Sequence, residues 1–167
     1  MSKGVFQTKI SPAYDDLPER QYHFPRTYLN QVQRTVGDWI VYYEPRRATV
    51  DILSRGGRQS YFALARVTQI RQDLEREDHF YADVADYLAF DRAVPFREGG
   101  HFYESAMRGQ DGRTNSGSAQ RAVRNMPDKE FDEIVAAGFE PPRDCRRLVG
   151  LSYAAMGRLS MAAVAAS

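Results

Sequence analysis

The chain has 167 residues, of which 43% are hydrophobic and 27% charged. This length and composition predict one globular domain with a single core. The single cysteine, Cys145, excludes an internal disulfide and a zinc site built from several cysteines, and it fits a reducing cytoplasm. The N-terminus lacks the pattern of a signal peptide, and the weakly apolar stretch 148–167 contains Arg158, which argues against a membrane span. We therefore expect a cytoplasmic protein that does not contact membranes.

Charge is unevenly distributed along the chain, although the formal net charge is only +1. Residues 45–72 hold six arginines and one acid, and residues 105–127 hold four arginines and one acid. Acids gather instead at 15–19, 75–91 and 128–140. Because arginine makes bidentate contacts with phosphates and base edges, a basic face for nucleic acid is one interpretation. A coding bias towards GC-rich codons explains the excess of arginine over lysine equally well.

The first half of the chain predicts a strand, a helix and a long hairpin. Residues 4–10 alternate apolar and polar side chains, as in a half-buried strand. Pro25 suits the first position of a helix that would run to about Arg34. The stretches 39–43 and 60–67 are rich in β-forming residues and predict an antiparallel hairpin with a long, basic tip. We expect the functional surface at the open end of this hairpin.

In the second half of the chain, the periodicity of apolar residues distinguishes less clearly between strands and helices. Residues 79–90 favour a strand by composition, with a helix as the alternative. Residues 127–137 are the clearest helix of the chain, and Gly138 suits the position just after its C-terminus. We assign residues 1–140 to one domain and residues 141–167 to a C-terminal appendage that is helical or disordered.

Motifs for catalysis and metal binding are not found in the sequence. Each of the three histidines is followed by phenylalanine, and none forms a helical pair suited to zinc. No lysine stands two residues after an acid, as PD-(D/E)xK nucleases require, and neither a phosphate-binding loop nor a nucleophile elbow is present. We therefore expect no metal, no cofactor and no catalytic residue. Whether the protein takes part in an enzymatic reaction stays open, but the chain alone is not expected to catalyse one.

Aromatic residues make up 12% of the chain, and several fall on predicted loops beside arginines. An aromatic ring can stack on an unstacked base, which contributes roughly 1–3 kcal/mol. Neighbouring polar groups can then read the base edge, while arginines hold the phosphates. The alternative is that these rings fill the ends of a barrel, and each ring taken singly is more often a core residue.

Several stretches resemble the EVE domains of the PUA-like superfamily. They are the Gly-Asp-x-apolar strand at 36–43, its answering strand at 61–67, and an apolar-Pro-apolar step at 94–96. The opening at 4–29 and the stretch at 118–139 are similar to the N-terminal EVE-like domain of bacterial HNH restriction endonucleases. The resemblance implies an α+β fold, a PUA-like (EVE-type) mixed β-barrel of about five to six strands flanked by two to three helices.

The resemblance also implies a nucleic-acid-binding module that flips a modified base into an aromatic pocket, with modified cytosine in DNA as the expected ligand. Stacking is expected from Tyr22, Phe24 and Phe102. Edge contacts are expected from Asp16 and Glu44, because an acid can accept a hydrogen bond from the cytosine amino group. The base-binding candidates are Ser11, Tyr14, Asp16, Tyr22, Phe24, Tyr43, Glu44, Phe102 and Tyr103. The candidates for contacts to the nucleic-acid backbone are Arg26, Arg46, Arg47, Arg121 and Arg124.

The resembling endonucleases continue into an HNH nuclease domain, whereas this sequence carries no nuclease signature. The chain is then a stand-alone reader, a truncated product, or the targeting part of a restriction-type system whose nuclease partner acts in trans. Two further interpretations stay open. One is a protein-interaction or regulatory PUA-like domain without base binding, and the other is a reader of modified RNA.

Overall fold

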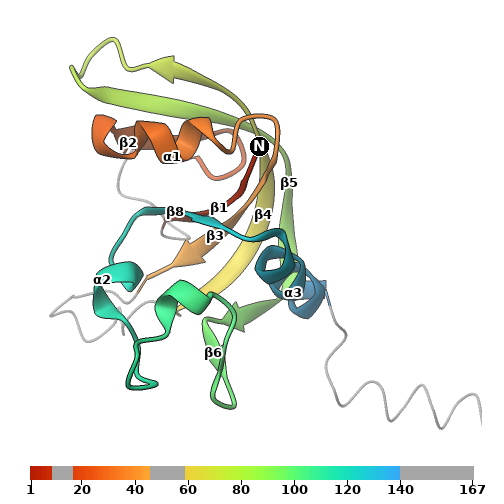
Figure 1. The fold of residues 1–167 in the computed structure, drawn as a ribbon. Helices are drawn as coiled ribbons and strands as arrows, with labels where there is room; N and C mark the ends of the chain where they lie inside the picture. Colours follow the sequence, from red (N-terminus) through yellow and green to blue (C-terminus); the bar gives the residue numbers. More distant parts are fainter. Residues whose placement is uncertain (9–16, 46–58, 140–167) are drawn as a thin grey trace, which may run out of the picture.

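A curled sheet of six strands forms the centre of the protein in the computed structural model, which describes residues 1–8, 17–45 and 59–139 (Figure 1). The strand order is β2-β5-β4-β3-β1-β8. The sheet is mixed, because β1 and β3 run parallel whereas the other neighbours run antiparallel. The strands are β1 (Lys3–Gln7), β2 (Gln21–Pro25), β3 (Trp39–Glu44), β4 (Ser60–Gln72), β5 (His79–Pro95) and β8 (Val123–Met126).

Short elements complete the described part of the chain. A small two-stranded sheet pairs β6 (Arg97–Glu98) with β7 (His101–Phe102). The α-helices are α1 (Leu29–Gln33), α2 (Ser116–Ala119) and α3 (Asp128–Phe139), and the 3-10 helices are η1 (Arg26–Tyr28) and η2 (Ser105–Met107). Among the described residues, no helix combines the length and the apolar character that a membrane crossing needs. The predicted appendage at 141–167 lies outside the described residues.

The predicted hairpin is confirmed, and it is the centre of the sheet. Strand β3 pairs antiparallel with β4, from Trp39 opposite Arg66 to Glu44 opposite Ser60. The segment 79–90 is a strand, as its composition favours, and it belongs to the longer β5. Strand β5 returns along β4 after a turn at 73–78, so β4 and β5 form a second, much longer hairpin.

Two hydrophobic clusters lie on opposite faces of this sheet. Along β3, Val41 and Tyr43 belong to the first cluster, and Ile40 and Tyr42 belong to the second. Successive side chains of a strand point to opposite faces, so the alternation separates the two clusters. Helix α3 adds Phe131, Ile134 and Ala137 to the first cluster, whereas Val32 of α1 and Tyr22 and Phe24 of β2 belong to the second.

Three local predictions need correction. Strand β1 is buried on both faces over Gly4, Val5 and Phe6, because it lies between β3 and β8 rather than at a half-exposed edge. Pro25 ends strand β2 opposite His79, so the predicted helix begins later and is reduced to η1 and α1. Gly138 lies inside α3 instead of following it, and the helix runs on to Phe139.

Most of the connections between strands lie at one end of the strands, and we call this end of the sheet the loop end. Strands β1, β3 and β5 end there, and β4 and β8 begin there, as their pairing directions require. The connections 9–16 and 46–58, which follow β1 and β3 in sequence, lie outside the described residues. The β6–β7 hairpin projects from the molecule next to η2 and α2 at the loop end, whereas the turn between β4 and β5 lies at the opposite end of the strands (Figure 1).

Candidate nucleic-acid interface

Three arginines stand exposed on the segments that build the loop end. Arg97 lies on β6, Arg108 directly follows η2, and Arg121 precedes β8. None of the three forms an ion pair with another described residue. The guanidinium group of Arg97 instead lies over the ring of Phe102, with 5.1 Å between its carbon and the ring centroid. Exposed guanidinium groups whose donors are not used by carboxylates are suited to binding phosphates.

The β6–β7 hairpin presents Arg97 on a tight turn. Gly99 and Gly100 form its tip with φ angles of 54° and 87°. Two successive positive φ angles define the type of turn that closes two-residue hairpins, and glycine adopts them without strain. The turn sets Arg97 opposite Phe102, which is 93% buried. The exposed cation is thereby held beside an anchored ring.

A buried polar network lies beneath this surface. Glu104 accepts two hydrogen bonds from Arg124, from Nε at 2.8 Å and from Nη2 at 2.7 Å, and a third from the Tyr61 hydroxyl at 2.6 Å. Burial disfavours the charge of Arg124, but the hydrogen bonds and the charge of Glu104 outweigh burial and raise the pKa of the guanidinium. Burial and the neighbouring Glu104 also raise the pKa of Tyr61 well above its usual range. The network therefore holds a charged guanidinium group and a neutral tyrosine hydroxyl against the same carboxyl group.

Arg124 supports the interface from inside and does not lie on its surface. Its side chain is only 5% exposed, because Glu104 and the ring of Tyr43 surround it. Its Nη1 donates a hydrogen bond to the backbone carbonyl of Arg121 at 2.7 Å. The predicted contact of Arg124 with a phosphate is thus not available in this arrangement. Arg124 fixes the backbone that carries the exposed Arg121.

The predicted aromatic residues do not form a single cage. Tyr43, Phe102 and Tyr103 belong to the first cluster, whereas Tyr22 and Phe24 belong to the second, on the opposite face of the sheet. All five are buried, with exposed fractions between 1% and 9%. Phe24 pairs with Phe80 near the turn between β4 and β5, at the end of the strands opposite the loop end. The suggested joint stacking of Tyr22, Phe24 and Phe102 on one base therefore does not fit the structure.

Tyr22 and Glu44 do reach the loop end. The Tyr22 hydroxyl donates to the carbonyl oxygen of Gln7, the last residue of β1, at 3.1 Å and lies 3.4 Å from that of Ala122. Glu44 is the last residue of β3, where it pairs with Ser60 and is 2% exposed. Tyr22 and Glu44 are therefore the described base-contact candidates at the ends of β1 and β3.

The other predicted residues fall in two groups. Arg26 lies at the end of the strands opposite the loop end. It forms an exposed ion pair with Asp78, with 2.6 Å between Nε and Oδ1. Ser11, Tyr14, Asp16, Arg46 and Arg47 lie outside the described residues. Sequence reasoning missed Arg97 and Arg108, and the Gly99-Gly100 pair was the local signal for the hairpin that positions Arg97. Over the described ranges, no group of three or more histidine, cysteine or acidic side chains could hold a metal ion.

Comparisons with known proteins extend the description of the fold. No protein-family model matches the sequence, and no curated protein matches it. Two solved structures are similar. The N-terminal domain of McrB from Staphylothermus marinus has a TM-score of 0.50 at 8% identity, with 79% of this chain and 92% of that chain covered. Human THYN1, solved in complex with DNA containing 5-methylcytosine, has a TM-score of 0.54 at 12% identity, with 85% and 100% covered.

These likenesses concern the fold, because both identities are low. They agree with the curled mixed sheet and flanking helices that the described residues form. The sequence-based prediction of the architecture is confirmed at the level of the fold: the chain has an α+β, PUA-like fold.

Proposed function

We propose that the loop end binds DNA and recognises a modified cytosine flipped out of the duplex. The observation that carries this proposal is the set of three exposed arginines, Arg97, Arg108 and Arg121, which no carboxylate of a described residue neutralises. Phosphate contacts of this kind supply affinity without sequence preference. The similar fold of THYN1, seen with DNA containing 5-methylcytosine, supports DNA as the polymer and modified cytosine as the base.

Glu44 is the proposed reader of the base edge. A carboxylate accepts a hydrogen bond from the amino group of cytosine, and burial at the end of β3 would strengthen that contact. The Tyr22 hydroxyl is a proposed polar contact of the base, because it lies beside the carbonyl groups of Gln7 and Ala122, whereas the Tyr22 ring itself is covered by Phe6 and Phe24. Ser11, Tyr14 and Asp16 in the connection 9–16 stay candidates for the same site.

In the cell, the proposed role is that of the targeting part of a restriction-type system, with a nuclease supplied in trans. Recognition and cleavage would then reside on separate chains. The competing interpretations are a PUA-like domain that binds protein without binding a base, and a reader of modified RNA. The following titration separates the DNA reader from these two alternatives.

The test is a binding titration of the purified chain with one short duplex carrying unmodified, 5-methylated or 5-hydroxymethylated cytosine, at two salt concentrations. We expect salt-sensitive binding with a preference for a modified duplex. Arg121→Ala should weaken binding to all three duplexes alike and reduce the salt dependence by about one counterion. Glu44→Gln should instead leave the salt dependence unchanged and weaken binding of the modified duplex by roughly 1–3 kcal/mol, because only a flipped cytosine presents its amino group to Glu44.

Arg76→Ala is the matched control, because Arg76 is exposed on the turn between β4 and β5, away from the loop end. It removes the same charge and should leave the DNA affinity within about twofold. An equal loss from Arg76→Ala and Arg121→Ala would show that binding follows net charge and not the loop end. Absence of binding to every duplex, with binding to a methylated RNA of the same sequence, would replace DNA by RNA in the proposal.

A further inference from the structure

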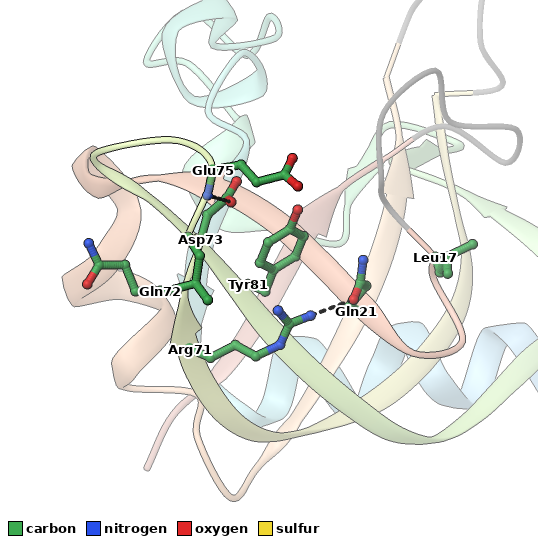
Figure 2. A pocket seen from close by; sticks show the side chains of 8 residues that line it. Leu17, Gln21, Arg71, Gln72, Asp73, Glu75 and Tyr81 are labelled. Carbon is green, nitrogen blue, oxygen red and sulfur yellow. Dashed lines mark hydrogen bonds between the residues drawn. The ribbon is translucent and has the colours of Figure 1, made fainter.

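A separate groove lies far from the loop end, on the outer side of the β2–β5–β4 part of the sheet (Figure 2). Its volume is about 910 Å³. Its walls come from the segment around Leu17 and Gln21, from the end of β4 with the following turn, and from Tyr81 near the start of β5. Strand β4 has 13 residues, so up to about 40 Å of extended chain separates this groove from the loop end.

The positive charge in the groove is already satisfied by the protein. Arg71 donates from Nε to Asp83 at 3.0 Å and from Nη2 to Gln21 at 2.6 Å, as the dashed line in Figure 2 shows for Gln21. Its guanidinium group also stacks on the ring of Tyr81, 4.2 Å from the centroid. Asp73 is likewise occupied, because it pairs with Nε2 of His23 at 2.9 Å.

Glu75 is the remaining charged residue of the groove lining, next to the paired Arg71 and Asp73. Its backbone N–H donates to Asp73 at 2.9 Å, which fixes its position on the turn. Its carboxylate is exposed and forms no ion pair with another described residue. Figure 2 shows the Glu75 side chain and the Tyr81 hydroxyl on the same side of the groove. Glu75 is therefore the charged residue of the groove lining whose carboxylate no described residue neutralises.

Two exposed leucines complete the groove walls. Leu74 is 97% exposed and Leu17 is 52% exposed, and they are two of the four large apolar side chains that stand out on the described surface. Apolar side chains gathered around a concave polar site are typical of surfaces that bind another protein. The turn 73–78 adds three further acids to Glu75, with Arg76 as its only basic residue.

We infer that this groove docks a segment of a partner protein in which a lysine or arginine is flanked by leucine-sized apolar residues. The basic side chain would pair with Glu75, and the apolar neighbours would cover Leu17 and Leu74. Nucleic acid does not suit the groove, because acidic side chains repel phosphates. The inference is independent of the proposed base recognition, and the separation along β4 would allow both ligands to bind at once.

The test uses three nine-residue fluorescent peptides in a Gly/Ser background and the full chain. The first carries two lysines flanked by leucines, the second has glutamates in place of the lysines, and the third has serines in place of the leucines. We expect fluorescence anisotropy to show binding of the first peptide and binding of the other two that is weaker by about fivefold or more. Equal binding of the first and second peptides, or no binding of the first, would overturn the inference.

Variants place the binding in the groove. Glu75→Gln and Leu74→Ser alter exposed side chains, and each should weaken the first peptide by roughly fivefold, whereas Glu77→Gln on the same turn should stay within about twofold. Equal effects of Glu75→Gln and Glu77→Gln would refute docking in the groove. A concentration-dependent dimer that Glu75→Gln disrupts, without peptide binding, would assign the groove to a second copy of the chain. Loss of DNA binding with retained peptide binding would overturn only the proposed function.

Discussion

Glu104 and Arg124 form a two-point ion pair in the interior of the protein, with exposed side-chain fractions of 2% and 5%. The two hydrogen bonds between them measure 2.7 and 2.8 Å. Glu104 directly precedes η2, and Arg124 lies on β8, so the pair joins two segments that are 20 residues apart in the sequence. Because Arg124 also holds the carbonyl group of Arg121, this pair links the core to the candidate interface.

Glu104→Gln is expected to lower the free energy of unfolding by about 3–5 kcal/mol, because it leaves the buried charge of Arg124 without its counter-charge. Urea denaturation followed by circular dichroism measures the effect. Asp111→Asn is the control, since it removes a carboxylate from the exposed pair with Arg113, which measures 3.9 Å. This control should cost less than about 1 kcal/mol. Equal losses in the two variants would contradict a special role for the buried pair.

This pair also shows what the sequence could not reveal. Arg124 stands in a basic stretch, and Glu104 stands in a glycine-rich stretch, so both resemble solvated surface residues. Nothing local distinguishes a buried arginine from an exposed one, because its burial depends on a partner 20 residues away. The β3–β4 hairpin was predictable, since β-forming residues and the Gly37-Asp38 turn mark it locally.

The aromatic residues illustrate a second limit. The alternation in β2, which was not predicted as a strand, separates Tyr22 and Phe24 from their polar neighbours, but it does not reveal which face of the sheet they share with other strands. That face depends on the strand order, which places β2 beside β5 at one edge. Phe24 and Phe102 therefore look like partners in the sequence and lie in different clusters in the structure. Pro25 misled in a similar way, because it can end a strand as well as begin a helix.

Buried tyrosines should make the protein sensitive to alkaline pH. Burial raises the pKa of Tyr43 to about 12, and burial together with the hydrogen bond to Glu98 raises the pKa of Tyr103 to about 12. In the unfolded chain these groups ionise near a pKa of about 10. A raised pKa in the folded state means that their contribution to stability is complete below about pH 10 and is lost between about pH 10 and 12.

Absorbance of tyrosinate during an alkaline titration checks this expectation. The buried residues Tyr43, Tyr61 and Tyr103 should ionise only as the protein unfolds. Denaturation at a series of pH values should show a smaller alkaline loss for Tyr103→Phe than for the native chain, because the variant lacks one of these groups. A single ionisation step near pH 10, with the protein still folded, would contradict the prediction.

Phe24→Ala should act on stability and not on base recognition. The ring is 1% exposed and stacks between Tyr22 and Phe80, so its removal leaves a cavity in the second cluster. We expect a loss of about 3–5 kcal/mol in the free energy of unfolding. Leu88→Ala truncates a half-exposed apolar side chain and should cost about 0.5 kcal/mol. A stable Phe24→Ala variant that has lost its preference for modified cytosine would instead place Phe24 in the base site.

Gly138 brings the backbone of α3 close to the sheet. A Cβ atom at this position would lie 2.5 Å from Cγ of Phe90 and within 2.8 Å of two further atoms of that ring. The ring cannot easily move away, because it also packs edge-on against Phe139, with 5.3 Å between the centroids. Gly138→Ala should therefore destabilise the protein by about 1–2 kcal/mol, although alanine favours a helix more than glycine does.

Gly117→Ala provides the comparison, because it places the same methyl group in helix α2 with only one neighbour, Asn115 Oδ1 at 3.5 Å. It should leave the unfolding free energy unchanged or raise it by up to about 1 kcal/mol, as alanine restricts the unfolded chain. Thermal and urea denaturation of both variants measure the difference. If Gly138→Ala were as stable as Gly117→Ala, helix α3 would have to sit farther from Phe90 than the structure shows, and Gly138 would be a helix residue without a packing requirement.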